Sequence, residues 1–236
     1  MMFDFVGVVK MKNEIINGNI CLGTWIQTGS PVVSEILANA GYKWVAVDLE
    51  HTETCLESFT NILRAVSKYD IFPMVRVCAN SIISIRRCLD SGAKGIIVPL
   101  INNKEDAEKA VKATKYPPLG VRGFAFVRAN EWGADFDTYA QHANDEIVVI
   151  VMIETKEAVD HIDEILSVDG VDGVFIGPYD MSGSYGVAGQ TAHQLVEEAK
   201  TKVLDACKRH KKAAGQHIVV PTKENVRAAI DEGYTF

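Results

Sequence analysis

Short apolar runs alternate along the chain with longer segments whose apolar residues recur at helical spacing. Seven runs predict strands, at residues 20–26, 43–50, 72–77, 94–100, 146–154, 170–177 and 213–220. Seven predicted helices follow them, at residues 31–41, about 54–68, 81–92, 103–114, 156–167, about 191–212 and 221–232. The apolar runs are nearly continuous, which is typical of strands covered on both faces in a parallel sheet. The pattern therefore predicts an α/β fold built from βαβ units.

Seven strand–helix units are one fewer than a closed (β/α)8 TIM barrel contains. The 236 residues are also slightly short of the roughly 250 that this barrel usually has. The last four residues, 233–236, fit the start of an eighth strand. We therefore predict one TIM-barrel domain over residues 1–236 that is truncated at its C-terminus and lacks the last strand–helix unit. The stretch 116–144, rich in Gly, Pro and aromatic residues, is expected to be a long functional loop.

Composition narrows the class of protein. Apolar residues make up 47% and charged residues 23%, which is ordinary for a globular protein, and the net charge of −7 argues against a nucleic-acid partner. No apolar run approaches the roughly 18 residues of a membrane helix, and the first residues lack the pattern of a signal peptide. The five cysteines show no CxxC spacing, so we expect reduced thiols in a cytoplasmic protein without membrane association.

Ionisable side chains fall where the predicted strands end. In a barrel of parallel strands this edge carries the chemistry. The candidates are Asp48, Glu50 and His51 after the second strand, Arg76 after the third, Glu154 after the fifth and Asp180 after the sixth. Taken alone, Glu154 could be a helix cap, Asp180 a turn residue and His51 a hydrogen-bonded loop residue. Four strands that all end in ionisable groups are not expected from packing alone.

These residue types together suit one kind of chemistry. Two carboxylates from neighbouring strands can hold a hard divalent cation that keeps water ligands and open positions. An arginine supplies a fixed positive charge for a carboxylate or enolate oxygen, and a histidine transfers protons near neutral pH. Metal, arginine and histidine are together equipped to form an enolate beside a carbonyl group.

Several segments resemble the HpcH/HpaI aldolase family in order and spacing. They are GTWIQTGSPVVSEILANAGYKWVAVDLEHT, PMVRV, LDSGAKGIIVPL, KYPPLGVRG, IET and DGVFIGPYDMSGSYG. Within them, the motifs DLEH, YPPxGxRG and GVFIGPYD are specific in combination. The resemblance runs from about Gly23 to the C-terminus. It implies a metal-dependent aldolase on a TIM barrel that cleaves a 4-hydroxy-2-oxo acid reversibly to pyruvate and an aldehyde.

The resemblance also implies roles for single residues. Glu154 and Asp180 match the two metal-ligating carboxylates, with Mg2+, Mn2+ or Co2+ as the candidate metals. His51 matches the catalytic histidine, and Asp90 matches the aspartate paired with it. Arg76 matches the arginine at the carbonyl and enolate of the substrate.

Further implied positions surround this set. The backbone amides around Gly177, Pro178, Tyr179 and Asp180 match those that receive the pyruvate carboxylate. Asp48 and Glu50 match acidic positions close to the catalytic residues. The resemblance also implies a homo-oligomer, commonly a hexamer built from dimers.

Met152 departs from the family pattern, because the family commonly has a glutamine two residues before the metal-ligating glutamate. Methionine lacks the amide that would donate a hydrogen bond. It could enlarge or dry the pocket, or mark a subgroup with a different substrate.

Other sequence features separate the alternatives. Lys43 and Lys94 precede strands, so they are expected at the far end of the barrel, which disfavours a Schiff-base aldolase. No phosphate-binding or dinucleotide fingerprint is present, so we expect no nucleotide cofactor. A lyase acting on a CoA thioester and a catalytically weakened family member are the alternative functions. Arg122 either anchors its loop or reaches a neighbouring subunit, and His217 could line the pocket.

Overall fold

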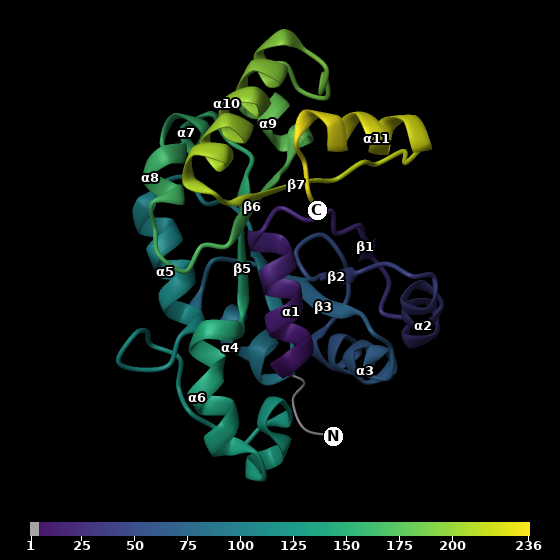
Figure 1. Ribbon diagram of the computed structural model, residues 1–236, viewed down its shortest axis with the longest axis vertical. Coiled ribbons are helices and arrows are strands. Elements are labelled where there is room, and N and C mark those ends of the chain that lie inside the picture. The colour runs from purple at the N-terminus through teal and green to yellow at the C-terminus, as the bar shows by residue number, and fades with distance from the viewer. Residues whose placement is uncertain (1–4) are drawn as a thin grey trace.

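Seven parallel strands pair in the order in which they occur along the chain, and the sheet curls on itself (Figure 1). The computed structural model describes residues 5–236, with side chains from residue 10 onward. The strands are β1 (Gly23–Ile26), β2 (Trp44–Asp48), β3 (Phe72–Arg76), β4 (Gly95–Val98), β5 (Val148–Ile153), β6 (Gly173–Ile176) and β7 (Ala213–Gln216). The predicted α/β fold is confirmed as a curled half-barrel of the TIM-barrel type.

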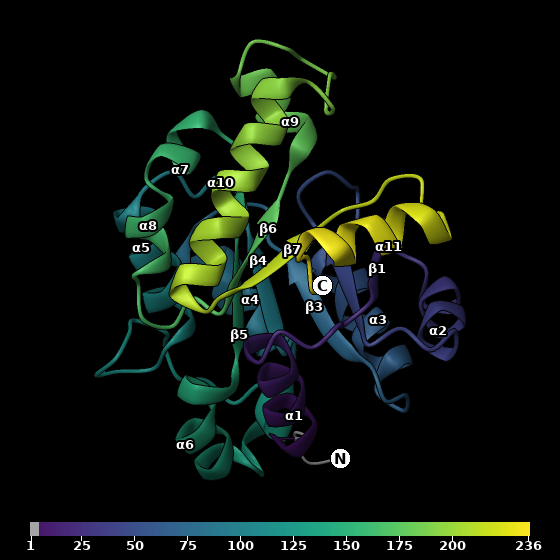
Figure 2. The same cartoon turned by 45° about the horizontal axis from the view of Figure 1, so that its top comes forward.

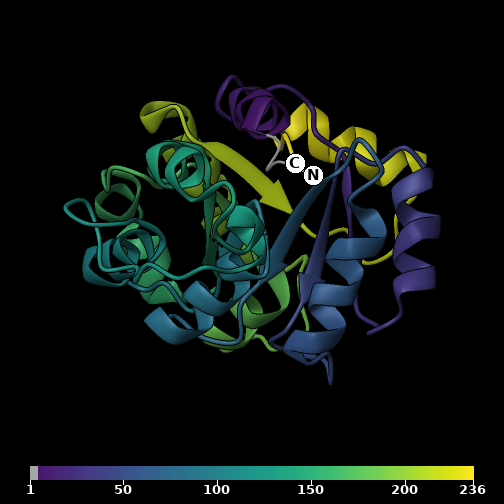
Figure 3. The same cartoon turned by 90° about the horizontal axis from the view of Figure 1, so that it is seen from below.

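Helices alternate with the strands and lie around the outside of the curled sheet (Figures 2 and 3). They are α1 (Phe5–Ile16), α2 (Pro31–Asn39), α3 (Leu56–Val66), α4 (Ile82–Asp90), α5 (Lys104–Thr114), η1 (Arg128–Gly133), α6 (Phe136–Glu146), α7 (Lys156–Asp160), α8 (Ile162–Leu166), α9 (Pro178–Ser184), α10 (Gln194–His210) and α11 (Lys223–Glu232). Helix α1 lies instead on the concave side, where Met11 and Ile15 pack with inward-facing strand residues.

Side chains alternate between an inner and an outer cluster along each strand. Trp44 and Ala46 of β2 belong to the inner cluster, and the residues between them pack outward against the helices. Because successive side chains of a strand point to opposite faces, the next inward positions fall on polar residues at the strand ends. Because every second side chain of a strand points inward, Asp48, Arg76 and Glu154 lie on the inner face at the carboxyl edge of the sheet.

The edge strands β1 and β7 do not pair with each other among the described residues. The last residues of the chain lie between them. The Thr235 N–H donates to the Ala214 carbonyl (2.8 Å), and the Thr235 carbonyl accepts from the Cys21 N–H (2.7 Å). The Phe236 carbonyl accepts from the Gln216 N–H (3.1 Å). An eighth strand would make hydrogen bonds of this kind on both sides; the further strand–helix unit itself stays a prediction.

Some local expectations are wrong. The stretch 116–144 contains the 3₁₀ helix η1 and helix α6, which buries Tyr139 and Ala143 at helical spacing among polar neighbours that hide the pattern. The residues after β6 begin helix α9 directly, and the expected strand 213–220 ends at Gln216. Helix α1 has no counterpart among the predicted elements. The predicted order of strands and helices is still correct, because it derives from the buried apolar runs that form the strands.

All five cysteines are free thiols, as expected. Within residues 5–236 no helix is both long and apolar enough to cross a bilayer.

Candidate active site

The carboxyl end of β2 carries a turn that Asp48 organises. Its Oδ1 accepts hydrogen bonds from the backbone N–H groups of Glu50 (3.0 Å) and His51 (3.3 Å). The Thr52 hydroxyl donates to the Asp48 carbonyl. A carboxylate that bonds the backbone two and three residues ahead fixes the conformation of the turn. The turn therefore presents the Glu50 carboxylate and the exposed His51 imidazole in a defined place.

Arg76 ends the neighbouring strand β3 and is the register partner of Asp48. Its Nε and Nη2 donate to Oδ1 (2.9 Å) and Oδ2 (2.6 Å) of Asp48. Such a two-pronged pair fixes the plane of the guanidinium. Burial raises the pKa of Asp48, but the Arg76 bonds and charge and the two backbone N–H groups outweigh burial and hold this pKa below its usual value. Asp48 is therefore ionised and Arg76 is held in one orientation.

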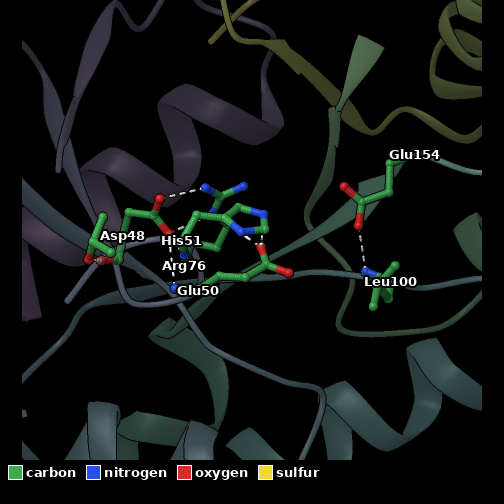
Figure 4. Close-up of polar contacts among 7 residues, drawn as sticks. Asp48, Glu50, His51, Arg76, Leu100 and Glu154 are labelled. Atoms are coloured by element: carbon green, nitrogen blue, oxygen red, sulfur yellow. Dashed lines mark hydrogen bonds and ion pairs between the residues drawn. The ribbon is translucent and has the colours of Figure 1, made fainter. Parts of the chain in front are cut away.

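Glu50 lies close to both the arginine and the histidine (Figure 4). Its Oε2 is 3.4 Å from Arg76 Nε and 3.6 Å from His51 Nε2, and it accepts no hydrogen bond although it is buried. Burial is the largest influence on the pKa of Glu50 and raises it; Arg76 and His51 oppose this effect, whereas the charges of Asp48 and Asp180 add to it. Glu50 is thus the carboxylate beside the His51 imidazole.

Glu154 follows β5 and is only 4% exposed. Its Oε1 accepts a hydrogen bond from the Leu100 backbone N–H (2.8 Å) across the site from His51 (Figure 4). Burial raises the pKa of Glu154; the Leu100 bond and Arg76 oppose this, and the charges of Glu50 and Asp180 raise the pKa further. The position is a buried carboxylate with negative neighbours, which a bound cation would relieve.

Helix α9 brings Asp180 to the same edge of the sheet. Gly177 caps this helix directly after β6, and the exposed Asp180 lies in its first turn. A Cβ on Gly177 would lie 3.1 Å from Glu154 Oε2, so the glycine keeps the approach to that oxygen open. Oxygen ligands of this type suit Mg2+ or Mn2+. Within the part of the chain that is described, no group of three or more His, Cys, Asp or Glu side chains is placed to hold a metal ion.

Fewer backbone N–H groups are available to receive a carboxylate at this edge than the sequence predicts. The Gly177 N–H already donates to the Ile153 carbonyl (3.2 Å). Pro178 has no N–H to donate. The N–H groups of Tyr179 and Asp180 remain as candidate donors at the start of the helix.

Met152 lies beneath this pair of carboxylates. It belongs to the inner cluster, is 3% exposed, and its methyl group would lie 3.6 Å from a Cβ on Gly177. The floor of the site beneath Glu154 is therefore apolar at this position.

The predicted pair of Asp90 and His51 does not form within this chain. Asp90 ends α4, and because that helix runs back to the edge where the next strand begins, its last residue lies away from the carboxyl ends of the strands. Asp90 Oδ1 instead accepts a bond from Arg122 Nη2 (2.9 Å). The Arg122 side chain is fully buried and packs on the rings of Tyr116 and Tyr139. Arg122 therefore anchors its loop.

The comparison with protein families places the chain in a known family. The family described as HpcH/HpaI aldolase/citrate lyase matches residues 22–236. The chain belongs to this family.

Individual relatives agree with this assignment. A 4-hydroxy-2-oxo-heptane-1,7-dioate aldolase of Shigella sonnei (strain Ss046) is 37% identical over 229 residues, which are 96% of this chain and 86% of the relative. A hydroxypyruvate/pyruvate aldolase of Sagittula stellata is 40% identical over 204 residues, or 86% of this chain and 79% of the relative. This HpcH/HpaI family member is therefore a carbon–carbon lyase.

Solved structures show the same relationship. A family protein from Burkholderia cenocepacia J2315 matches with a TM-score of 0.92 and 34% identity, covering 96% of this chain and 90% of that one. A citrate synthase matches with a TM-score of 0.82 and 31% identity, covering 95% of this chain and 87% of that one.

Two residues that contact the candidate site, Trp25 and Leu100, were not predicted from the sequence. The Trp25 ring lies 4.9 Å from the Arg76 guanidinium and 5.7 Å from the His217 ring. Trp25 and His217 also line a neighbouring cavity of about 400 Å3 beside the ends of the chain's edge strands. Trp25 could have been found from its inward position two residues after Gly23. Leu100 could not, because its contribution is a backbone N–H held at φ 55°, which no sequence pattern signals.

Proposed function

We propose that the protein is a divalent-metal-dependent aldolase that cleaves a 4-hydroxy-2-oxo acid reversibly to pyruvate and an aldehyde. The observation that carries the proposal is the group of Arg76, Glu50 and His51, held by Asp48, opposite the buried Glu154. The aldolase names of the relatives support the same reaction class.

Glu154 and Asp180 would hold the metal, with Mg2+, Mn2+ or Co2+ as candidates. Two features support the fit: the raised pKa of Glu154, caused by burial and by two negative neighbours, and the open approach beside Gly177. A divalent cation bound there would act as a Lewis acid on the keto group of a 2-oxo acid.

His51 is the proton-transfer group in this proposal. It removes the proton from the 4-hydroxyl of the substrate as the C3–C4 bond breaks, and returns a proton in the reverse direction. Glu50, with Oε2 3.6 Å from His51 Nε2, stabilises the imidazolium that forms. This role falls to Glu50 because Asp90 is bonded to Arg122.

Arg76 stabilises the negative charge that develops on the pyruvate enolate. Its bonds to Asp48 use Nε and Nη2 and leave Nη1 for the substrate. A charge that is already oriented costs no reorganisation during the reaction. The Tyr179 and Asp180 N–H groups would receive the pyruvate carboxylate.

Release of pyruvate from 4-hydroxy-2-oxo acids, with and without EDTA, tests the reaction. We expect turnover to stop with EDTA and to return with added Mg2+, Mn2+ or Co2+. Substituting His51→Ala should lower kcat by about 100-fold or more, whereas the exposed His161→Ala serves as a matched control with normal activity. Full turnover in EDTA would refute the metal-dependent mechanism.

Deuterium exchange at the methyl group of pyruvate tests enolisation without knowledge of the aldehyde. Exchange is expected to need metal, Arg76 and Glu154. Metal binding without exchange would instead favour the catalytically weakened family member.

A lyase acting on a CoA thioester is the second candidate. It is favoured by the likeness to a solved citrate synthase. Competition by free CoA separates the two, since the aldolase proposal predicts that pyruvate release is unaffected.

We also propose a cytoplasmic homo-oligomer, of the dimer-based hexamer type that the family resemblance implies. Helix α11 buries none of its own residues, and Val219 and Val220 before it are 55% and 70% exposed. Light scattering of the purified protein measures the assembly directly.

A further inference from the structure

A second cavity lies at the edge of the sheet where the strands begin, opposite the candidate active site. Its volume of about 550 Å3 is within the range of small-molecule pockets. Lys43 precedes β2, Phe72 begins β3 and Lys94 precedes β4, and these residues line the cavity together with parts of α1, α3 and η1. The cavity is therefore separated from the proposed metal and substrate site by the length of the strands.

The lining of this cavity is basic, although the protein carries a net charge of −7. Among the residues whose side chains are described, its carboxylates are Glu14, Asp70 and Glu131. The cationic side chains of the same residues are Lys10, Lys43, Arg64, Lys68, Lys94 and Arg128, of which Lys68 is paired with Glu35 outside the cavity (2.9 Å). Such a local excess of one charge in a concave surface concentrates ligands of the opposite charge.

Two arginines of the lining donate hydrogen bonds to neutral groups. Arg128 Nη1 donates to the Ser91 carbonyl (2.9 Å), and Gly92 makes room for it, since a Cβ there would lie 2.4 Å from that nitrogen. Arg64 Nη1 donates to Asn61 Oδ1 (2.5 Å). Burial lowers the pKa of Arg128, and the charge on Arg64 lowers it further. The charge of Glu131, a neighbouring carboxylate of the lining, opposes both effects and raises the pKa of Arg128.

The rim of the cavity is a strained segment. Glu131 and Trp132 have φ values of 53° and 52°, in the left-handed region that is unfavourable for residues other than glycine. Such backbone persists only where the surrounding structure enforces it, and it clusters at binding sites and clamps. Here it holds the Trp132 side chain at the rim with 64% of its surface exposed.

We propose that this cavity binds a small phosphate monoester, with Arg64 and Arg128 on the phosphate and the Trp132 ring against the remainder of the molecule. Guanidinium groups match phosphate oxygens in a two-pronged geometry. A dianion between the two arginines would also relieve their mutual repulsion. The proposal is independent of the aldolase reaction, because no residue of the two sites is shared.

Isothermal titration calorimetry on the full chain tests this site, with phenyl phosphate, inorganic phosphate and benzoate as probes. Phenyl phosphate should bind more tightly than inorganic phosphate, and benzoate should bind least. Arg64→Gln and Arg128→Gln should each weaken the binding of phenyl phosphate by at least about tenfold. Arg209→Gln is the matched control, because this exposed arginine is paired with Asp163 elsewhere on the surface.

Two further measurements locate the ligand. Trp132→Ala should weaken the binding of phenyl phosphate but leave the binding of inorganic phosphate unchanged. Arg64→Gln should leave the rate of pyruvate release unchanged. Arg64 is exposed, so its variant keeps the test valid if Arg128→Gln fails to fold. Four results would each overturn the proposal. They are the absence of phosphate binding, equal affinities for phenyl phosphate in all variants, benzoate binding as tight as that of phenyl phosphate, and loss of phenyl phosphate binding in Arg76→Gln rather than in Arg64→Gln or Arg128→Gln.

Discussion

The bond between Asp90 and Arg122 gives a prediction whose size can be worked from the structure. Arg122 Nη2 lies 2.9 Å from Asp90 Oδ1, and the guanidinium is fully buried while the carboxylate is 19% exposed. The remaining contacts of the guanidinium are the Tyr139 hydroxyl (3.1 Å) and the rings of Tyr116 and Tyr139. The substitution Asp90→Ala would therefore leave a buried positive charge with neutral partners only.

The expected cost follows from the burial of this pair. Removing one partner of a buried ion pair costs about 3–5 kcal/mol. The two rings still attract the cation, and the partial exposure of Asp90 admits water, so we expect the lower end, about 3 kcal/mol. In a chain of this length that corresponds to a fall in Tm of roughly 6–12 °C.

Urea unfolding of the wild type and of Asp90→Ala measures this cost. The matched control is Asp163→Ala, which removes an exposed aspartate that lies 2.8 Å from Arg209 Nη2 and 2.9 Å from His210 Nε2. Exposed pairs contribute about 1 kcal/mol or less, so the two variants share one chemistry and differ in burial. The double substitution Asp90→Ala with Arg122→Met should recover much of the loss, since no buried charge remains.

Equal and small losses for Asp90→Ala and Asp163→Ala, with unchanged m values, would refute the reasoning from burial. If Asp90→Ala instead remains stable but loses aldolase activity, Asp90 takes part in the reaction.

Three other expectations are open to measurement. Asp48→Asn should make the free energy of unfolding less sensitive to acid. Because the pKa of Asp48 is lowered in the folded protein, ionised Asp48 contributes its full stabilisation above a pH of about 4, and this stabilisation is lost as the pH falls through the folded pKa. Urea unfolding midpoints measured over a range of pH test this. Gly120→Ala should destabilise by about 1–3 kcal/mol, because a Cβ there would lie 2.3 and 2.4 Å from two backbone oxygens, whereas Gly183→Ala, in an open helical position, should stabilise by up to about 1 kcal/mol. Met152→Gln should cost about 1–3 kcal/mol in thermal unfolding, because it places an amide in an apolar floor.

Much of the active-site edge could be predicted from the sequence. The strand periodicity has a physical cause, since alternate side chains face the inside of the curl, and it brings Asp48, Arg76 and Glu154 to one edge of the sheet. The turn after Asp48 is also local, because the carboxylate bonds N–H groups two and three residues ahead. Such signals survive in the sequence because they depend on spacing along the chain.

The sequence by itself determined the α/β class, the strand order and the edge where ionisable groups gather, because buried strands need apolar runs and parallel strands end together. Tertiary structure decided which of those groups touch. Glu50 rather than Asp90 lies beside His51, and Leu100 holds Glu154 through a backbone N–H. These choices depend on helix direction and on the approach of segments far apart in the chain, which the spacing of residues does not record.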